Sequence, residues 1–508
     1  MAKTAKRQVE ETEFSKHLKK YLQEHEITVA ELAAEVGMDR VTVFRYVKGE
    51  RKPDDTMIVE KILDALRMRS AEREQILEEY DRAKMGDEMV ESHKYMKKLM
   101  IELKNVVEKS KPKEHAWKQF VTMPMEGKTL CLNSKKEIEM CSAVLLENTV
   151  KHAGEHAQVH FLMQPAYSII QELMLSSFVN TNIVVEQIVC LEQNTQKSYR
   201  NLEAFRLLVP SCFSNMNYKV RYYYSELKEH LNEMSWMPNV IITDVGVLQF
   251  DYAMEHGLFV TDEAYIEGIR QQYDYFHKHS KPFLIKTEGL ECTQQLYEAM
   301  LEDFKSPIGE DDKTVDTLFV QPCLGMCVSS DMYQKYLYPS PVKEMFTMGM
   351  AATRGDWNGL EHLHYGQNLP LKTVNYFKLS GLKDFMETGR IREFPSVFYE
   401  PIAMEDRIAA VQRMFVLLKE GNMKYHIVDD SMELPDNICF YIGGGERMFL
   451  NLVKEDSFVQ IQIAERGICQ VFRQYMSYLR EKNQLLGSEE TERILREFAE
   501  ENGLSSAV

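Results

Sequence analysis

The chain has 508 residues, and 61 Lys or Arg against 78 Asp or Glu give a net charge of −17. This length suggests about three folding units, and the acidic balance excludes a protein that coats nucleic acid with its whole surface. No apolar run approaches the roughly 18 residues of a membrane span, and the N-terminus lacks the apolar core of a secretory signal. The nine scattered cysteines fit reduced thiols, so we expect a cytoplasmic protein.

The charge is unevenly placed along the chain. Residues 1–85 hold 17 Lys or Arg and 18 Asp or Glu, a net charge of −1, and the remainder carries −16. A phosphate backbone is repelled by such an acidic body and tolerated only by local basic positions. We therefore expect nucleic-acid contacts, if any, in the N-terminal part.

Residues 1–84 are predicted to form a domain of five short helices. Apolar residues spaced four apart predict the first helix: Phe14, Leu18 and Leu22. Thr28, followed three residues later by Glu31, matches a capping box. Gly37 permits the left-handed conformation that ends the second helix. Asp39 starts the third helix, Pro53 with Asp54 and Asp55 starts the fourth, and Ser70 starts the fifth.

These residues carry a resemblance to a known family. The segment Thr28-Val-Ala-Glu-Leu-Ala-Ala-Glu-Val-Gly37, with Met38-Asp-Arg-Val-Thr-Val-Phe-Arg-Tyr-Val-Lys-Gly49 and Glu50-Arg-Lys-Pro53, resembles the Cro/lambda-repressor-like (XRE) helix-turn-helix family over about residues 10–70. The resemblance implies an all-α bundle that binds double-stranded DNA, usually as a homodimer on paired half-sites. An alternative is a small helical bundle that merely packs against the body.

Helical geometry divides the third helix into two sides. Val43, Tyr46 and Val47 cluster on the side expected to face the bundle. Val41, Arg45 and Lys48 lie opposite, with Phe44 at the edge and Arg40 in the first turn.

The resemblance implies that this outward face enters the major groove. Arg40 and Arg45 are then candidates for a guanine edge, and Val41 or Phe44 for thymine methyl groups. Phosphate contacts are expected from Thr28, Val29, Lys48, Arg51 and Lys52. Phe44 departs from the smaller or polar residue usual in the family, and the alternative is that it packs against another part of the protein.

Residues 85–113 are predicted to be a helical linker or dimerisation strut. Apolar residues spaced four and three apart support a helix: Leu99, Leu103 and Val106. A plain connecting helix packed on the body explains the pattern equally well. The break at Lys109-Ser-Lys-Pro-Lys113 marks the boundary to the body.

The body shows a diverged internal repeat. Asn215-Met-Asn-Tyr-Lys-Val220 recurs as Asn422-Met-Lys-Tyr-His-Ile427, and Phe161-Leu-Met-Gln-Pro165 resembles Leu318-Phe-Val-Gln-Pro322. We therefore expect a large α/β (α+β) body of two halves, 114–310 and 311–508, each with its own mixed sheet. Strands are expected at 158–163, 239–243, 318–321 and 437–442. The second half carries an expected insertion at 340–394, which is either a lid or pocket wall or an insertion without a function.

No complete catalytic, metal or cofactor motif is found in the body. Duplicated α/β halves also occur in phospholipase-D-like proteins, but their His-x-Lys-x4-Asp motif is absent. His152, His156 and His160 have helical metal-ligand spacing, but Gly154 interrupts the helix. Cys323 and Cys327 lack a second pair, and Gly443-Gly-Gly445 is predicted to be a hairpin turn rather than a phosphate loop.

The favoured hypothesis is a sequence-specific transcriptional regulator, not an enzyme. Its N-terminal domain reads DNA, and its body senses a small-molecule or protein effector or directs assembly. The alternative is an enzyme or effector protein that carries an autoregulatory DNA-binding domain. A third hypothesis, an all-helical peptide receptor, conflicts with the predicted strands.

Overall fold

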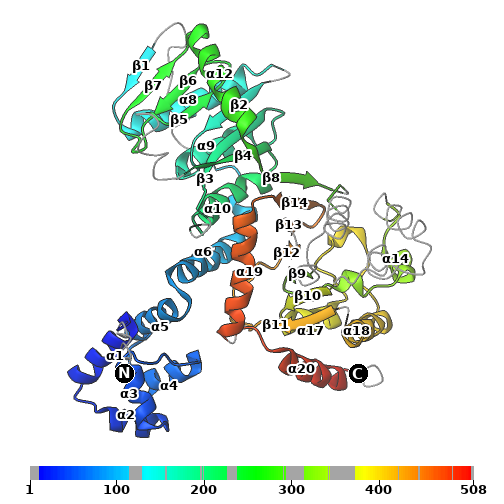
Figure 1. The fold of residues 1–508 in the computed structure, drawn as a ribbon. Coiled ribbons are helices and arrows are strands. Elements are labelled where there is room, and N and C mark those ends of the chain that lie inside the picture. Colours follow the sequence, from blue (N-terminus) through cyan, green and yellow to red (C-terminus); the bar gives the residue numbers. More distant parts are fainter. Residues whose placement is uncertain are drawn as a thin grey trace, which may run out of the picture. The chain divides into compact units, whose positions relative to one another are not determined.

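The computed structural model describes residues 11–113, 129–154, 157–194, 197, 199–225, 237–289, 291–292, 314–340, 343, 372–421, 423–443, 447–482 and 484–504. Contacts divide the chain into two compact units (Figure 1). Unit 1 comprises residues 1–96 and 474–484, and unit 2 comprises residues 97–473 and 485–508. The domain borders expected after residues 84 and 113 stay predictions, because they concern which parts of the chain fold independently. In the described part of the chain, no helix is long and apolar enough to cross a membrane.

Unit 1 begins with five helices: α1 (Glu13–Glu24), α2 (Val29–Val36), α3 (Arg40–Val47), α4 (Thr56–Ala65) and α5 (Ser70–Met85). Their starts follow local sequence signals, because the side chains of Thr12, Thr28, Asp39 and Asp55 each accept a hydrogen bond from the first turn of the helix that follows. The helix α5 differs, since its N-cap is Arg69 and no side chain caps it. The five helices share one apolar core, which runs from Phe14 to Tyr80.

Two long helices each contribute residues to both units. The helix α6 (Asp87–Leu103) belongs to unit 1 up to Met96 and to unit 2 from Lys97. The helix α19 (Arg466–Glu481) belongs to unit 2 up to Arg473 and to unit 1 from Gln474. Within the predicted segment 85–113, residues 87–103 are helical as α6 and residues 106–109 form a short further helix α7 (Val106–Lys109), and the role of the segment as a linker or dimerisation strut stays a prediction.

Unit 2 contains fourteen described strands and the helices that connect them. The strands of its first part are β1 (Thr129–Leu132), β2 (Gln158–Leu162), β3 (Val184–Glu192), β4 (Asn217–Ser225), β5 (Asn239–Ile242), β6 (Val247–Phe250), β7 (Gly257–Val260) and β8 (Lys281–Glu288). Those of its second part are β9 (Thr314–Leu318), β10 (Lys372–Phe377), β11 (Met423–Ile427), β12 (Ile438–Ile442), β13 (Met448–Val453) and β14 (Phe458–Ile463).

Most helices of unit 2 lie between these strands in sequence, and α20 follows the last strand. In the first part they are α8 (Lys135–Lys151), α9 (Ser168–Phe178), α10 (Tyr199–Phe213) and α12 (Glu263–His279). In the second part they are α14 (Ser330–Tyr336), α17 (Leu379–Thr388), α18 (Met404–Lys419) and α20 (Ser488–Glu501), with short 3-10 turns η4 (Leu324–Met326) and η5 (Ser396–Phe398). The predicted α+β class is confirmed.

All fourteen strands form a single mixed sheet in the order β1-β7-β6-β5-β2-β3-β4-β8-β14-β13-β12-β9-β10-β11. The expectation of a separate sheet in each half was wrong. The strand β8 joins the strands of the two halves into one sheet, because it pairs antiparallel with β4 on one edge and with β14 on the other. The parallel pairs are β2 with β3, β3 with β4, β9 with β10, and β10 with β11.

The expected insertion at 340–394 needs correction. Its residues 372–377 form β10, which lies between β9 and β11 and is therefore an integral strand of the sheet. The motif at 355–359, with His362 and His364, lies outside the described residues.

Two smaller predictions concern the turns of unit 2. The strands β12 and β13 pair antiparallel, with the Gly443 N–H donating to the Arg447 carbonyl, so the glycine-rich segment connects a hairpin as predicted. The helix α8 ends at Lys151, and His160 lies in β2, whereas His156 is outside the described residues. His152 and His160 therefore do not share a helix. Among the described residues, no group of three His, Cys, Asp or Glu is placed to hold a metal ion.

Candidate nucleic-acid interface

The start of α2 is built by a capping box. The Thr28 hydroxyl accepts from the Glu31 N–H at 3.2 Å, and the Glu31 carboxylate accepts from the Thr28 N–H at 2.8 Å. These bonds to the backbone and side chain of Thr28 hold the pKa of Glu31 below its ordinary value. A negative charge therefore stands at the helix end where Thr28 and Val29 were predicted to hold phosphate. Val29 is also only partly accessible, since it packs against the helical core.

A sharp turn joins α2 to α3. Gly37 has a φ of 70°, the left-handed conformation that glycine adopts without strain. Asp39 then caps α3, because its carboxylate accepts from the N–H groups of Val41 and Thr42 at 3.0 and 3.1 Å. The two helices are thus fixed by residues within the turn itself.

The two sides of α3 are as predicted. Val43, Tyr46 and Val47 are buried in the core. Arg40, Val41, Phe44, Arg45 and Lys48 are exposed, and the exposed fractions of Val41 and Phe44 reach 55% and 42%. Phe44 does not pack into the core of unit 1. Its ring instead lies 4.8 Å from the Lys48 ammonium, a cation–π contact at the surface.

The basic residues near α3 differ in whether their side chains already make contacts within the protein. For Arg40 and Arg45, the described part of the structure shows no ion pair or side-chain hydrogen bond. Arg51 forms an ion pair with Asp54 at 2.5 Å, and the Lys52 ammonium donates to the carbonyl of Ala83. Among the described residues of α3 and the turn that follows it, Arg40 and Arg45 are therefore the guanidinium groups that can bind a ligand without first giving up a contact.

Unit 1 is completed by a segment that the sequence did not assign to it. Lys482 forms a buried ion pair with Asp81 of α5, and the Tyr478 hydroxyl donates to the same carboxylate at 3.4 Å. The buried ring of His93 in α6 makes edge-on contacts with Tyr475 and Tyr478. Burial lowers the pKa of His93 to about 3. A charged and an aromatic contact thus tie the segment 474–484 to α5 and α6.

Comparison with known proteins identifies the class of the N-terminal segment. Residues 18–70 match a family model described as Helix-turn-helix, which contains α2, α3 and the turn at Gly37. This segment is a helix-turn-helix domain of the XRE type, as the resemblance predicted. Domains of this class bind DNA through the second helix of the motif, here α3.

Two solved structures that resemble larger parts of the chain are distant from it in sequence. One is TrmBL2, an archaeal chromatin protein whose structure is described as showing a novel mode of DNA binding. Its identity is 12% and its TM-score 0.22, over 52% of this chain and 98% of that one. Another is a phosphatidylserine synthase of Haemophilus influenzae, with 9% identity and a TM-score of 0.20, over 74% of this chain and 94% of that one. A search of curated proteins gives no match.

Proposed function

We propose that the protein is a sequence-specific transcriptional regulator whose unit 1 binds double-stranded DNA with α3 in the major groove. The observation that carries this proposal is the division of α3 into a buried apolar side and an exposed side with Arg40 and Arg45. A guanidinium offers two parallel donors that match the acceptors of a guanine edge. Lys48, Arg51 and Lys52 are exposed nearby in sequence and supply charge for phosphates.

The body is proposed to be a sensing or assembly module rather than an enzyme. Residues 114–508 hold 37 Lys or Arg and 55 Asp or Glu, a net charge of −18, which makes the body unsuited to holding phosphates. A homodimer would place two copies of α3 on half-sites about one helical turn apart. An effector that binds the body would then change DNA affinity by changing the spacing of the two helices.

The two halves of the body are proposed to be related by duplication. The order β7-β6-β5-β2-β3-β4 has the same sequence of parallel and antiparallel pairs as β14-β13-β12-β9-β10-β11. The resembling segments Asn215–Val220 and Asn422–Ile427 include the starts of β4 and β11, which occupy the same position in these two orders. Topology and sequence therefore support the same pairing of halves.

The DNA claim is tested by selection. The full-length protein is incubated with random-sequence DNA, and the recovered DNA is sequenced. We expect one enriched motif made of two half-sites about 10 base pairs apart. The double variant Arg40→Ala, Arg45→Ala should lose the motif, whereas Lys61→Ala, which removes an exposed charge from α4, should keep it. Recovery without a motif, or the same motif with the double variant, would contradict the proposal.

A further inference from the structure

The sheet of unit 2 splits between β4 and β8. The strand β4 pairs with β3 over its whole length, from Asn217 to Ser225. It pairs with β8 only at Val220, Arg221 and Tyr222, with a break in register between the first two. The start of β4, residues 217–219, therefore has a ladder on its β3 side and none with β8.

The strand β8 diverges in the same place. It pairs with β14 from Leu284 to Glu288, but its last residue paired with β4 is Leu284. From Val220 toward the start of β4, and from Leu284 toward the end of β8, the two strands separate. There β4 stays paired with β3, and β8 stays paired with β14. We call this gap the β4–β8 fork.

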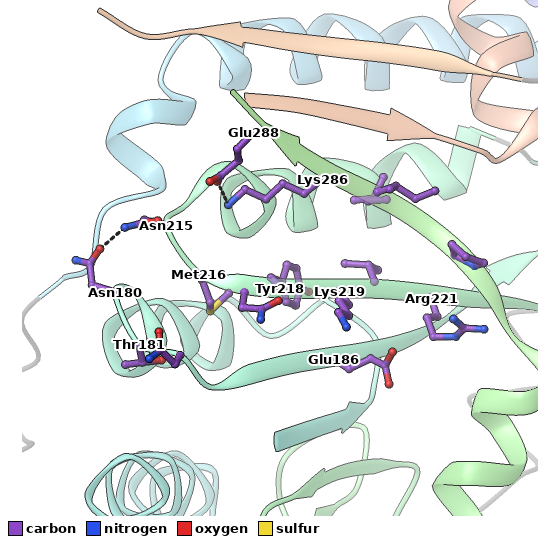
Figure 2. Close-up of a pocket in the computed structure, with 16 residues that line it drawn as sticks. Asn180, Thr181, Glu186, Asn215, Met216, Tyr218, Lys219, Arg221, Lys286 and Glu288 are labelled. Carbon is purple, nitrogen blue, oxygen red and sulfur yellow. Dashed lines mark hydrogen bonds and ion pairs between the residues drawn. The ribbon is translucent and has the colours of Figure 1, made fainter. Parts of the chain in front are cut away.

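A pocket of about 700 Å³ fills the fork. Its walls are the facing parts of β4 and β8, the start of β3 and the turns 180–182 and 215–216. Figure 2 shows Lys286 and Glu288 along one wall and Lys219 and Arg221 along the other. The volume is within the range of ligand pockets, roughly 300–1,000 Å³.

The charges in the fork are unequally engaged. Glu186 accepts a hydrogen bond from Tyr273 at 2.9 Å and lies 3.4 Å from the His277 imidazole, so contacts with α12 already engage it. Lys286 pairs with Glu288. Within the described part of the chain, Arg221 donates only to neutral oxygens, those of Ser280 and His277.

Of the described cations that line the pocket, Lys219 is the one that remains available. It lies directly opposite Glu186 in the β3–β4 register and is exposed. No ion pair or side-chain hydrogen bond is recorded for it within the described residues. Lys286 and Glu288 neutralise each other, so Lys219 and Arg221 supply the positive charge of the fork. The fork therefore favours a ligand that brings negative charge.

We propose that the β4–β8 fork binds an extended acidic peptide segment, which adds as a short strand to β8 and places a carboxylate next to Lys219. One feature favours a peptide over a small anion. The fork lies between two strand edges, and a peptide backbone supplies the alternating donors and acceptors that such edges bind. A small anion beside Lys219 would leave these edges unpaired.

This inference names an effector class for the body. An effect of the peptide on DNA affinity rests on the proposed function, but peptide binding itself does not. Peptide binding is measured on the full chain without DNA. A failure of peptide binding and a failure of DNA binding are therefore separate results.

The probe is a pooled set of labelled, end-blocked pentapeptides that alternate aspartate with Val, Ile, Leu or Phe. A basic set has lysine in place of aspartate, and a third set is acidic but carries N-methyl groups on alternate amides. Binding is followed by fluorescence anisotropy. We expect the acidic set to bind at least tenfold more tightly than the other two sets. Backbone hydrogen exchange of the protein should slow at residues 217–219 and 285–288 when the acidic set binds.

A charge reversal locates the site. Lys219→Glu should weaken binding of the acidic set at least tenfold, whereas Lys424→Glu, an exposed lysine on β11, should leave it unchanged. Equal effects of these variants, equal binding of the acidic and basic sets, or unchanged hydrogen exchange in the fork would overturn the proposal. Equal binding of the methylated set, with displacement by inorganic phosphate, would show a small-anion site and would also overturn it.

Discussion

Arg45 is the residue whose removal separates base reading from phosphate binding. It is exposed on α3, opposite Val43 and Tyr46, so Arg45→Ala should not disturb the core. Exposed substitutions usually change stability by less than about 0.5 kcal/mol. If Arg45 contacts a base, its loss should cost about 1–3 kcal/mol on the selected sequence and little on scrambled DNA. Anisotropy titrations on both DNAs check this, and equal weakening on both would make Arg45 a phosphate contact.

Lys48 is the matched comparison on the same helix. Its ammonium already lies over the Phe44 ring, and we expect it to contact phosphate rather than a base. Lys48→Ala should weaken all DNA sequences alike and lower the slope of log affinity against log salt by about one unit. Titrations at several salt concentrations measure that slope. An unchanged slope would exclude Lys48 from the phosphate contacts.

His93 makes the stability of unit 1 depend on pH. Burial lowers its folded pKa to about 3, and the unfolded value is about 6.5. The unfolded state thus takes up the proton first, so stability is complete above pH 6.5 and falls as pH decreases toward 3. At pH 5 the loss is about 2 kcal/mol. Hydrogen exchange of α5, corrected for its intrinsic pH dependence, should show this loss in the parent protein.

The variant His93→Phe is the control for this effect. It keeps a ring between Tyr475 and Tyr478 but does not titrate, so it should show no such loss between pH 7.5 and 5. Asp81, whose pKa is raised by burial, acts in the opposite direction and is present in both proteins. A parallel decline of the two proteins would assign the pH dependence to another group.

At the scale of the element, the ion pair between α5 and the segment 474–484 is the strongest test of unit 1. Asp81 is buried and Lys482 is largely covered, with side chains 9% and 12% exposed. Lys482→Met would leave an uncompensated carboxylate and should destabilise unit 1 by about 3–5 kcal/mol. Lys84→Met removes a more exposed pair with Glu481 and should cost less than about 1 kcal/mol. Hydrogen exchange of α5 compares the two variants.

A second substitution distinguishes charge from packing. Adding Asp81→Leu to Lys482→Met removes the buried charge and should restore most of the lost stability. If the double variant is as unstable as Lys482→Met alone, the segment 474–484 stabilises α5 through packing rather than through the ion pair.

The elements that the sequence predicted best are those with local signals. Thr28 with Glu31, Gly37 and Asp39 each act within their own turn, so the motif can be read without tertiary information. Ser70 shows the limit of such signals, since the structure places the N-cap one residue earlier without a side-chain bond. Lys482 could not be assigned to unit 1, because an isolated lysine gives no sign of a buried partner 401 residues away. The role of β8 was missed for the same reason, since its pairing partners are distant in sequence.

At the scale of the whole molecule, the charge division predicts where DNA binds. The core of the five N-terminal helices lies within residues 14–80, so a fragment of residues 1–84 should fold and bind DNA weakly. Residues 114–508 should show no binding, because that part is strongly acidic. Mobility shifts with both fragments at low salt test this. DNA binding by the larger fragment would overturn the assignment of function to the two parts.

The membership of residues 474–484 in unit 1 also has a consequence for synthesis on the ribosome. At roughly 5–20 residues per second, about 20–80 s pass between translation of the last residue of α6 in unit 1 and of the first residue of this segment. During that interval Asp81 and His93 lack their partners, and the nascent N-terminal unit is held only by its helical core. Full stability of the DNA-binding unit is thus reached only after the segment 474–484 has been translated. A prematurely terminated chain would carry a weakened unit that cellular proteases can remove.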